Sequence, residues 1–257
     1  MKMADSATFA ISQSGKSPDI VAMSANARRG GSLTIALTNV IASPLARESI
    51  AALDMLAGPE LSVAATKSFV NSAVAGLLIL AEWTGNLVLK NAIEALPQAL
   101  SQAVACDWSS LLEGVEGHTS LYILGRGPAW PIACEAALKF KETSGLHAEA
   151  YSAAEVMHGP ASIVGRAFPV LALAARDLSE EHVIKVCDRL ADQGASVFVT
   201  SSQPTKAQRL PFAATGFGLT DALVQIASFY GFVEMLSRKR GLDPDRPAHL
   251  NKVTETI

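Results

Sequence analysis

The chain has 257 residues, of which 49% are hydrophobic and 18% are charged, with a net charge of −3 and a mean hydropathy of +0.27. This composition is typical of a well-packed globular protein and excludes a disordered one. The basic clusters at 28–31 and 237–241 are too short and isolated for a nucleic-acid-binding surface.

Apolar runs typical of strands alternate with helical patterns along the chain. In the first part, strands are predicted at 8–12, 32–39 and 53–56, and helices at 20–31 and 63–84. A helix-rich stretch at 88–117 follows. Beyond it, strands are predicted at 120–127, 168–175 and 196–202, and helices from about 130, at 180–193 and at 219–240. The stretch 137–160 is interpreted as buried helix, although it carries seven ionisable side chains.

This alternation predicts an α/β fold with parallel sheets, built twice with a break near 100–118. In such sheets, ligands bind at the carboxyl ends of the strands. Two strand–helix turns qualify, at 12–19 and at 125–131. The second contains G-x-G without a third glycine, and an ordinary tight turn is its simpler interpretation.

The turn at 12–19, "SQSGKSPD", has the composition of an anion-binding turn. Ser12, Ser14 and Ser17 supply hydroxyl donors at a helix N-terminus, and Gly15 permits a tight turn. An ordinary helix cap by Ser17, with Pro18 at the first helical position, explains the same residues about equally well. The G-x-x-x-x-G-K-[ST] pattern of a P-loop is absent from this turn.

Three charged residues share one face of the helix predicted from about 130. Glu135, Lys139 and Glu142 are spaced i, i+4 and i+7. On an exposed face they would be an ordinary ion-pair ladder. Their neighbours are almost all apolar, however, and buried charges require partners or a function.

Several blocks of the sequence together resemble one known family. They are "ISQSGKSPD", "AGPELSVAATKSF" (57–69), "GRG" (125–127), "CEAALKFKETSGLHAEAYSAAEVMHGP" (134–160) and "DRPAHLNKVT" (245–254). The chain resembles the double-SIS (sugar isomerase) proteins, which include the isomerase half of glucosamine-6-phosphate synthase. The tail and "SVAATKS" are most similar to SIS-type glucosamine-6-phosphate deaminases.

The resemblance implies a flavodoxin-like α/β fold with two SIS domains, at 1–100 and 101–257, and a catalytic tail at 243–257. It implies that the substrate is bound by Ser12, Gln13, Ser14, Ser17, Val63, Ala65 and Asn251. Ala65 stands where synthases carry a serine that contacts the sugar phosphate. The resemblance also implies that the first domain lacks its usual N-terminal portion, and we expect that this portion is omitted from the 257 residues.

The resemblance further implies the catalytic roles. Glu142 is the base that moves a proton between C1 and C2, with Lys139 and Glu135 as its helical partners. His158 opens the sugar ring, reaching the site from a neighbouring subunit, and Lys252 forms an imine with the open-chain ketose. These residue types suit the steps, because a histidine titrates near neutrality and a carboxylate can accept a carbon-bound proton in a closed cavity.

Other interpretations stay open for individual residues. His158 could be a helix C-terminal residue favoured by the helix dipole, and Lys252 a solvated charge in the tail. His147 and His249 are interpreted as local hydrogen-bonding groups. Glu149 and Glu155 are interpreted as residues that hold the loop together.

We therefore expect a cytoplasmic homodimer that converts glucosamine 6-phosphate to fructose 6-phosphate and ammonia without a metal or an organic cofactor. The three scattered cysteines and the absence of a signal-like N-terminus agree with a cytoplasmic location. The expected partner is a small sugar phosphate, with no nucleic acid and no membrane. The alternatives are another phosphosugar isomerase, a deglycase, and a sensor that binds a sugar phosphate without turnover.

Overall fold

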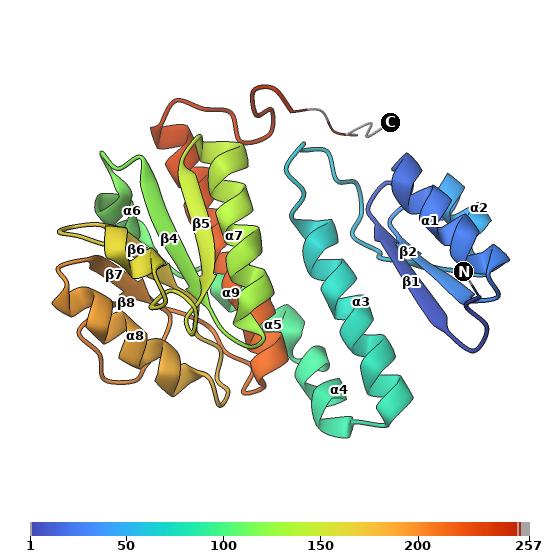
Figure 1. Ribbon diagram of the computed structural model, residues 1–257, viewed down its shortest axis with the longest axis horizontal. Helices are drawn as coiled ribbons and strands as arrows, with labels where there is room; N and C mark the ends of the chain where they lie inside the picture. The colour runs from blue at the N-terminus through green and yellow to red at the C-terminus, as the bar shows by residue number, and fades with distance from the viewer. Residues whose placement is uncertain (1, 251, 253–257) are drawn as a thin grey trace. The chain divides into compact units, whose positions relative to one another are not determined.

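The computed structural model describes residues 2–250 and 252 and divides into two compact units. Unit 1 consists of Met1–Thr84 together with Asp245–Ile257, and unit 2 consists of Gly85–Pro244. Each unit contains a parallel sheet flanked by helices (Figure 1), so the predicted α/β class is confirmed. The sequence-based domains were divided at residue 100, whereas the compact units divide after Thr84, and the tail belongs to unit 1.

Unit 1 is built on three parallel strands. These are β1 (Ala7–Ser12), β2 (Leu33–Thr38) and β3 (Ala51–Asp54), in the order β1-β2-β3. The helices α1 (Pro18–Arg29) and α2 (Pro44–Glu48) lie on one face of this sheet (Figure 1). There Leu45 packs with Ala10 and Ala36 in a small buried core. The long helix α3 (Lys67–Thr84) follows β3 after a loop.

Unit 2 contains five parallel strands in the order β5-β4-β6-β7-β8. The strands are β4 (Ser120–Gly125), β5 (His147–Ser152), β6 (Pro169–Ala172), β7 (Ser196–Val199) and β8 (Gln208–Arg209). The helices are α4 (Leu87–Glu94), α5 (Leu96–Val104), α6 (Ser109–Val115), α7 (Ala129–Ser144), α8 (Glu180–Asp192) and α9 (Gly218–Lys239), with a short 3₁₀ helix, η1, at Pro160–Ile163.

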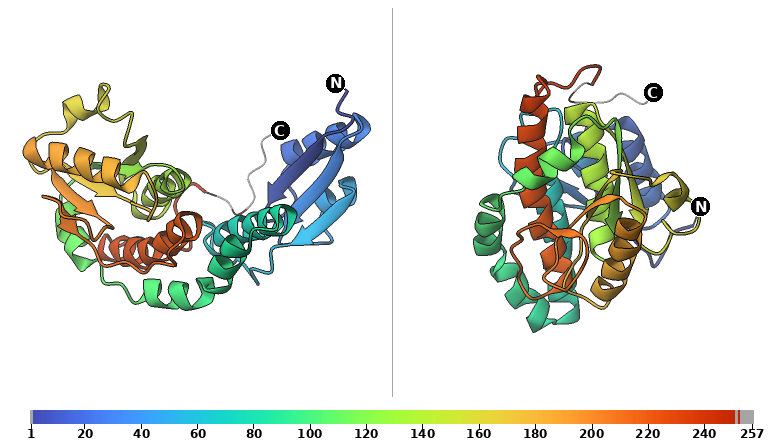
Figure 2. Two further views of the ribbon diagram at one scale, coloured as in Figure 1. Left: turned by 90° about the horizontal axis from the view of Figure 1, so that it is seen from below. Right: turned by 90° about the vertical axis from the view of Figure 1, so that its left-hand side faces the viewer.

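The sheet of unit 2 is covered on both faces, as parallel sheets require. α8 lies on one face, where Val183, Cys187 and Leu190 pack against the strands. α7 and α9 pack side by side on the other face (Figures 1 and 2). By length and composition α9 could cross a membrane, but 67% of its most apolar window is buried. It is therefore the central core helix of unit 2.

The prediction of continuous helix over 137–160 is wrong. α7 ends at Ser144 because Gly145 adopts a left-handed conformation (φ 57°) and donates its N–H to the Phe140 carbonyl. The chain then forms β5, which pairs with β4 at the edge of the sheet. The seven ionisable residues therefore belong to a helix, an edge strand and a turn.

Candidate active site

The serine-rich turn follows the carboxyl end of β1 and leads into α1, as the sequence predicts. It is closed by its own hydroxyls, since Gly15 N–H donates to Ser12 Oγ (3.2 Å) and Lys16 N–H to Ser14 Oγ (3.3 Å). Gly15 has φ 61°, and an added Cβ would collide with the Ser43 side chain. This position therefore requires glycine.

Ser17 occupies the N-cap position of α1, but its side chain makes no capping hydrogen bond. The ordinary capping explanation therefore does not account for the hydroxyl of Ser17. Together with the unpaired N–H groups of the first turn of α1, this hydroxyl can bind an anion. Gln13, at the start of the same turn, is fixed through its backbone carbonyl, which accepts the Asn39 N–H at 3.1 Å.

The loop before α3 is organised by Glu60, a residue for which the sequence predicted no role. One oxygen of its carboxylate accepts the Ser68 N–H and the Ser68 hydroxyl, both at 2.7 Å, and the Thr66 N–H at 3.3 Å. Glu60 thus caps α3 and holds the loop that contains Val63 and Ala65. Burial raises the pKa of Glu60, but these hydrogen bonds and the charge of Lys252 together lower the pKa below its ordinary value.

The C-terminal tail lies against the same loop. Lys252 Nζ donates to the Ser62 carbonyl, and the Ser62 hydroxyl donates to the Asp245 carboxylate. The Val63 N–H donates to the Asp245 carbonyl at 3.2 Å. Lys252 is therefore partly buried and bound within unit 1, which contradicts the interpretation of a freely solvated tail charge. Asn251, also predicted to bind substrate, lies outside the described residues.

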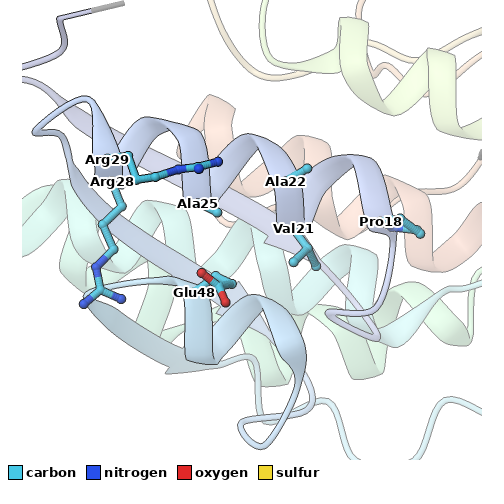
Figure 3. A pocket seen from close by; sticks show the side chains of 7 residues that line it. All are labelled: Pro18, Val21, Ala22, Ala25, Arg28, Arg29 and Glu48. Carbon is cyan, nitrogen blue, oxygen red and sulfur yellow. The ribbon is translucent and has the colours of Figure 1, made fainter.

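A cavity of about 660 Å³ opens at the carboxyl ends of the strands of unit 1. Its lining includes Gln13 from the serine-rich turn, Asn39, Asp54 and Glu60. It is thus adjacent to two of the predicted substrate-binding segments. A separate hollow of about 820 Å³ lies along α1 and α2 (Figure 3) and is lined by none of the predicted site residues.

The second group of predicted residues is assembled on α7 in unit 2. Lys139 Nζ lies 3.1 Å from Glu135 Oε1 and 2.8 Å from Glu142 Oε2. Lys139 and Glu135 are buried, whereas the Glu142 side chain is 22% exposed. The three side chains therefore form a buried cluster with more acid than base, which contradicts the interpretation of an exposed ion-pair ladder.

His158 is not on α7 but in the exposed turn after β5. Its backbone N–H donates to the Glu155 carbonyl at 2.9 Å. No helix ends at His158 in the described structure, so a helix dipole does not explain the residue. Within the described residues, the His158 side chain makes no hydrogen bond to Glu135, Lys139 or Glu142. The role implied for His158 stays a prediction.

A family model for the SIS domain matches residues 3–81 and 116–215. The chain belongs to the SIS domain family. The first matched segment falls in unit 1 and the second in unit 2, so each sheet corresponds to one SIS match.

Individual SIS relatives extend this finding. A structure described as a candidate phosphosugar isomerase from Silicibacter pomeroyi DSS-3 is 50% identical, with a TM-score of 0.91 over 95% of this chain and 75% of that chain. The glutamine–fructose-6-phosphate aminotransferase (isomerizing) of Sulfolobus acidocaldarius is 35% identical over 96% of this chain. This chain covers only 42% of that relative's length.

A third SIS relative shows the fold alone. The glucosamine-6-phosphate deaminase of Thermotoga maritima is 20% identical, with a TM-score of 0.79 over 99% of this chain and 76% of that chain. At this identity the likeness supports the shared architecture and carries no information on substrate.

Two residues that support the candidate site were not predicted from the sequence. Glu60 precedes Ser68 by eight residues, too far for the usual capping-box signal. Tyr230 on α9 donates its hydroxyl to Glu135 Oε1 at 2.9 Å, across a sequence separation of 95 residues. Only the packing of α7 on α9 brings Tyr230 and Glu135 together.

No cluster of three or more His, Cys, Asp or Glu side chains suited to a metal occurs among the described residues. His147 lies on β5, where its Nδ1 is 3.2 Å from the Ser120 hydroxyl, which agrees with a local hydrogen-bonding role. Glu149 interacts with Tyr151 on the same strand, and this bond helps to raise the pKa of Tyr151 to about 12.

Proposed function

We propose that the chain is an SIS phosphosugar enzyme that converts glucosamine 6-phosphate and water to fructose 6-phosphate and ammonia. The observation that carries the proposal is the buried α7 cluster, in which Lys139 binds both Glu135 and Glu142. The cluster fixes the carboxylate of Glu142 beside a buried ammonium group, and a positioned carboxylate is a suitable acceptor for a carbon-bound proton. The relatives named above as phosphosugar enzymes support the same class.

In the proposed reaction, ring opening exposes the C1 aldehyde beside the C2 amine, with His158 transferring the proton to the ring oxygen. The carboxylate of Glu142 then removes the C2 proton and delivers it to C1, while a second proton passes from the amine nitrogen to O1. The product of this step has a C1 hydroxymethyl group and a C2 imine. Water adds to the imine carbon and ammonia leaves, which gives the C2 ketone. The amine of Lys252 can form the corresponding imine with this ketone.

The serine-rich turn is proposed to hold the phosphate, using Ser12, Gln13, Ser14 and Ser17. The uncommitted hydroxyl of Ser17 and the first turn of α1 support this assignment. Val63, Ala65 and Asn251 are proposed to line the sugar. Phosphate binding away from the reacting carbons would orient the open chain. A cytoplasmic homodimer with a shared site, without metal or organic cofactor, is part of the same proposal.

The test is release of ammonia and fructose 6-phosphate from glucosamine 6-phosphate, without glutamine, by the full-length protein. Equal release of both products is expected. Glu142→Gln should lower the turnover by roughly 10²–10⁴-fold, because it removes the proton acceptor. The exposed Glu48→Gln variant on α2 is the control and should retain activity. Full activity of Glu142→Gln would contradict the assigned base.

A plain aldose–ketose isomerase is the second candidate, favoured by the 50% identical relative described as a candidate phosphosugar isomerase, and a deglycase is a further alternative. A panel of sugar phosphates with product analysis separates these reactions, because only a deaminase or deglycase releases an amine. Tight binding of every sugar phosphate tested, without turnover, would instead support a phosphosugar sensor.

A further inference from the structure

The α7 cluster has a fourth member that no motif indicates. Tyr230, on α9, donates a hydrogen bond to Glu135 Oε1 at 2.9 Å. The same oxygen is 3.1 Å from Lys139 Nζ, which in turn is 2.8 Å from Glu142 Oε2. The order along this network is therefore Tyr230, Glu135, Lys139 and Glu142, and it connects α9 to the proposed base.

We propose that Tyr230 is a positioning residue that controls the protonation of Glu142 by satisfying Glu135, so that Lys139 is left to bind Glu142. This inference rests on the function proposed above. Tyr230 itself does not touch the reacting atoms.

Burial explains why the tyrosine is needed. The Glu135 side chain is 8% exposed and that of Glu142 is 22% exposed. A buried carboxylate that loses a donor cannot replace the donor with water, whereas a more exposed one can. Without the Tyr230 hydroxyl, Glu135 therefore competes more strongly for the single ammonium group, and Lys139 moves away from Glu142.

The other charged groups on the elements around α7 have partners of their own or are exposed. On β5, His147 bonds to Ser120 and Glu149 to Tyr151, and on β4 the Tyr122 hydroxyl donates to the Pro160 carbonyl. On α9, Glu234 pairs with Arg238 near the solvent, and on α7 itself Lys141 is exposed. Within the described residues, Lys139 is the cation that is bonded to Glu142.

The test compares Tyr230→Phe with the wild type in two measurements. The first is the pH dependence of kcat/KM, where the acid limb should move to higher pH by about one unit, since Glu142 accepts a proton more readily. The plateau at higher pH should change little. The second is a ¹³C NMR titration of the Glu142 carboxyl, assigned by its loss in Glu142→Gln, which should shift in the same direction.

Tyr151→Phe is the matched control, because it removes a tyrosine hydroxyl that is bonded to a different glutamate, Glu149. It should leave the titration of Glu142 unchanged. An unchanged Glu142 titration in Tyr230→Phe, or an equal shift in Tyr151→Phe, would overturn the inference. An inactive wild type would overturn the proposed function, and the NMR titration would still decide the role of Tyr230 in the cluster.

Discussion

Glu60 organises its surroundings through one oxygen. That oxygen accepts two backbone N–H groups and one hydroxyl at the start of α3, where four N–H groups would otherwise lack partners. Charged acceptors of this kind form stronger hydrogen bonds than neutral ones. A charge therefore helps to hold the loop that carries Val63 and Ala65.

Replacement of Glu60 by glutamine should lower the free energy of unfolding by about 1 kcal/mol at neutral pH, since the acceptor becomes neutral. The pKa of Glu60 is lower in the folded chain than its ordinary 4.5, so the wild type has this stabilisation in full above pH 4.5. It loses the stabilisation as the pH falls through the lower, folded pKa. Urea unfolding of both proteins between pH 7 and pH 3 measures the difference.

The difference in free energy of unfolding between the wild type and Glu60→Gln should disappear at acid pH. Glu48→Gln, an exposed change on α2, serves as the control and should follow the wild type throughout. A constant gap at every pH would show that the charge of Glu60 is not what stabilises the loop.

At the scale of elements, sequence patterns predicted the strands whose apolar runs are bounded by turns. β1, β2 and β4 lie where they were expected, and so do α8 and α9 to within two residues. β5 was not predicted. Its sequence, "HAEAYS", has the polar alternation of an edge strand, but it follows α7 almost directly, and Gly145, which ends α7, was not interpreted as a helix C-cap. β3 begins at Ala51, before the predicted 53–56, and ends at Asp54, two residues before Leu56 takes a positive φ of 53°.

The candidate site was predictable to different degrees in the two units. The spacing of Glu135, Lys139 and Glu142 placed them on one face because helical periodicity is local. Their burial could not be read from spacing, since it depends on α9, which is distant in sequence. Glu60 and Tyr230 act through contacts that tertiary packing alone creates, so local patterns did not reveal them.

The β1–α1 turn gives a prediction for backbone geometry. Gly15 and Gly58 have similar positive φ angles of 61° and 65°, but only at Gly15 would an added Cβ collide with a neighbour, the Ser43 side chain. Gly58→Ala should therefore cost about 1–2 kcal/mol from conformation alone. Gly15→Ala should cost more, and it should also weaken the binding of a sugar phosphate by displacing the turn.

Thermal unfolding of the two variants, with isothermal titration calorimetry of glucosamine 6-phosphate on Gly15→Ala, measures these effects. The comparison cancels the shared cost of the left-handed conformation, so the remaining difference reports the contact with Ser43. Equal destabilisation by the two substitutions would contradict the steric account of Gly15.

At the scale of the whole molecule, unit 1 is assembled from the two ends of the described chain, and unit 2 is continuous in sequence. The Val63 N–H donates to the Asp245 carbonyl, and Lys252 and Asp245 both bond to Ser62. Removal of residues 245–257 should therefore accelerate amide hydrogen exchange in the loop 59–66, because these partners are lost.

Hydrogen exchange with mass spectrometry can follow both units in one experiment. The strands β4 and β6 of unit 2 serve as the internal control and should keep their protection, because their hydrogen bonds involve no residue of the tail. Loss of protection in β4 and β6 together with the loop would contradict the assignment of the tail contacts to unit 1.

The discontinuity of unit 1 also has a consequence for synthesis on the ribosome. Unit 2 can begin to fold once Pro244 has left the exit tunnel, because all of its residues are then available. The loop at 59–66 precedes Asp245 and Lys252 by about 180 residues in sequence, so it leaves the ribosome well before these partners do. Until Asp245 and Lys252 emerge, Glu60 is the one of these three residues that can hold the loop against α3. The incompletely folded first unit is therefore the part of the nascent chain that a chaperone would bind.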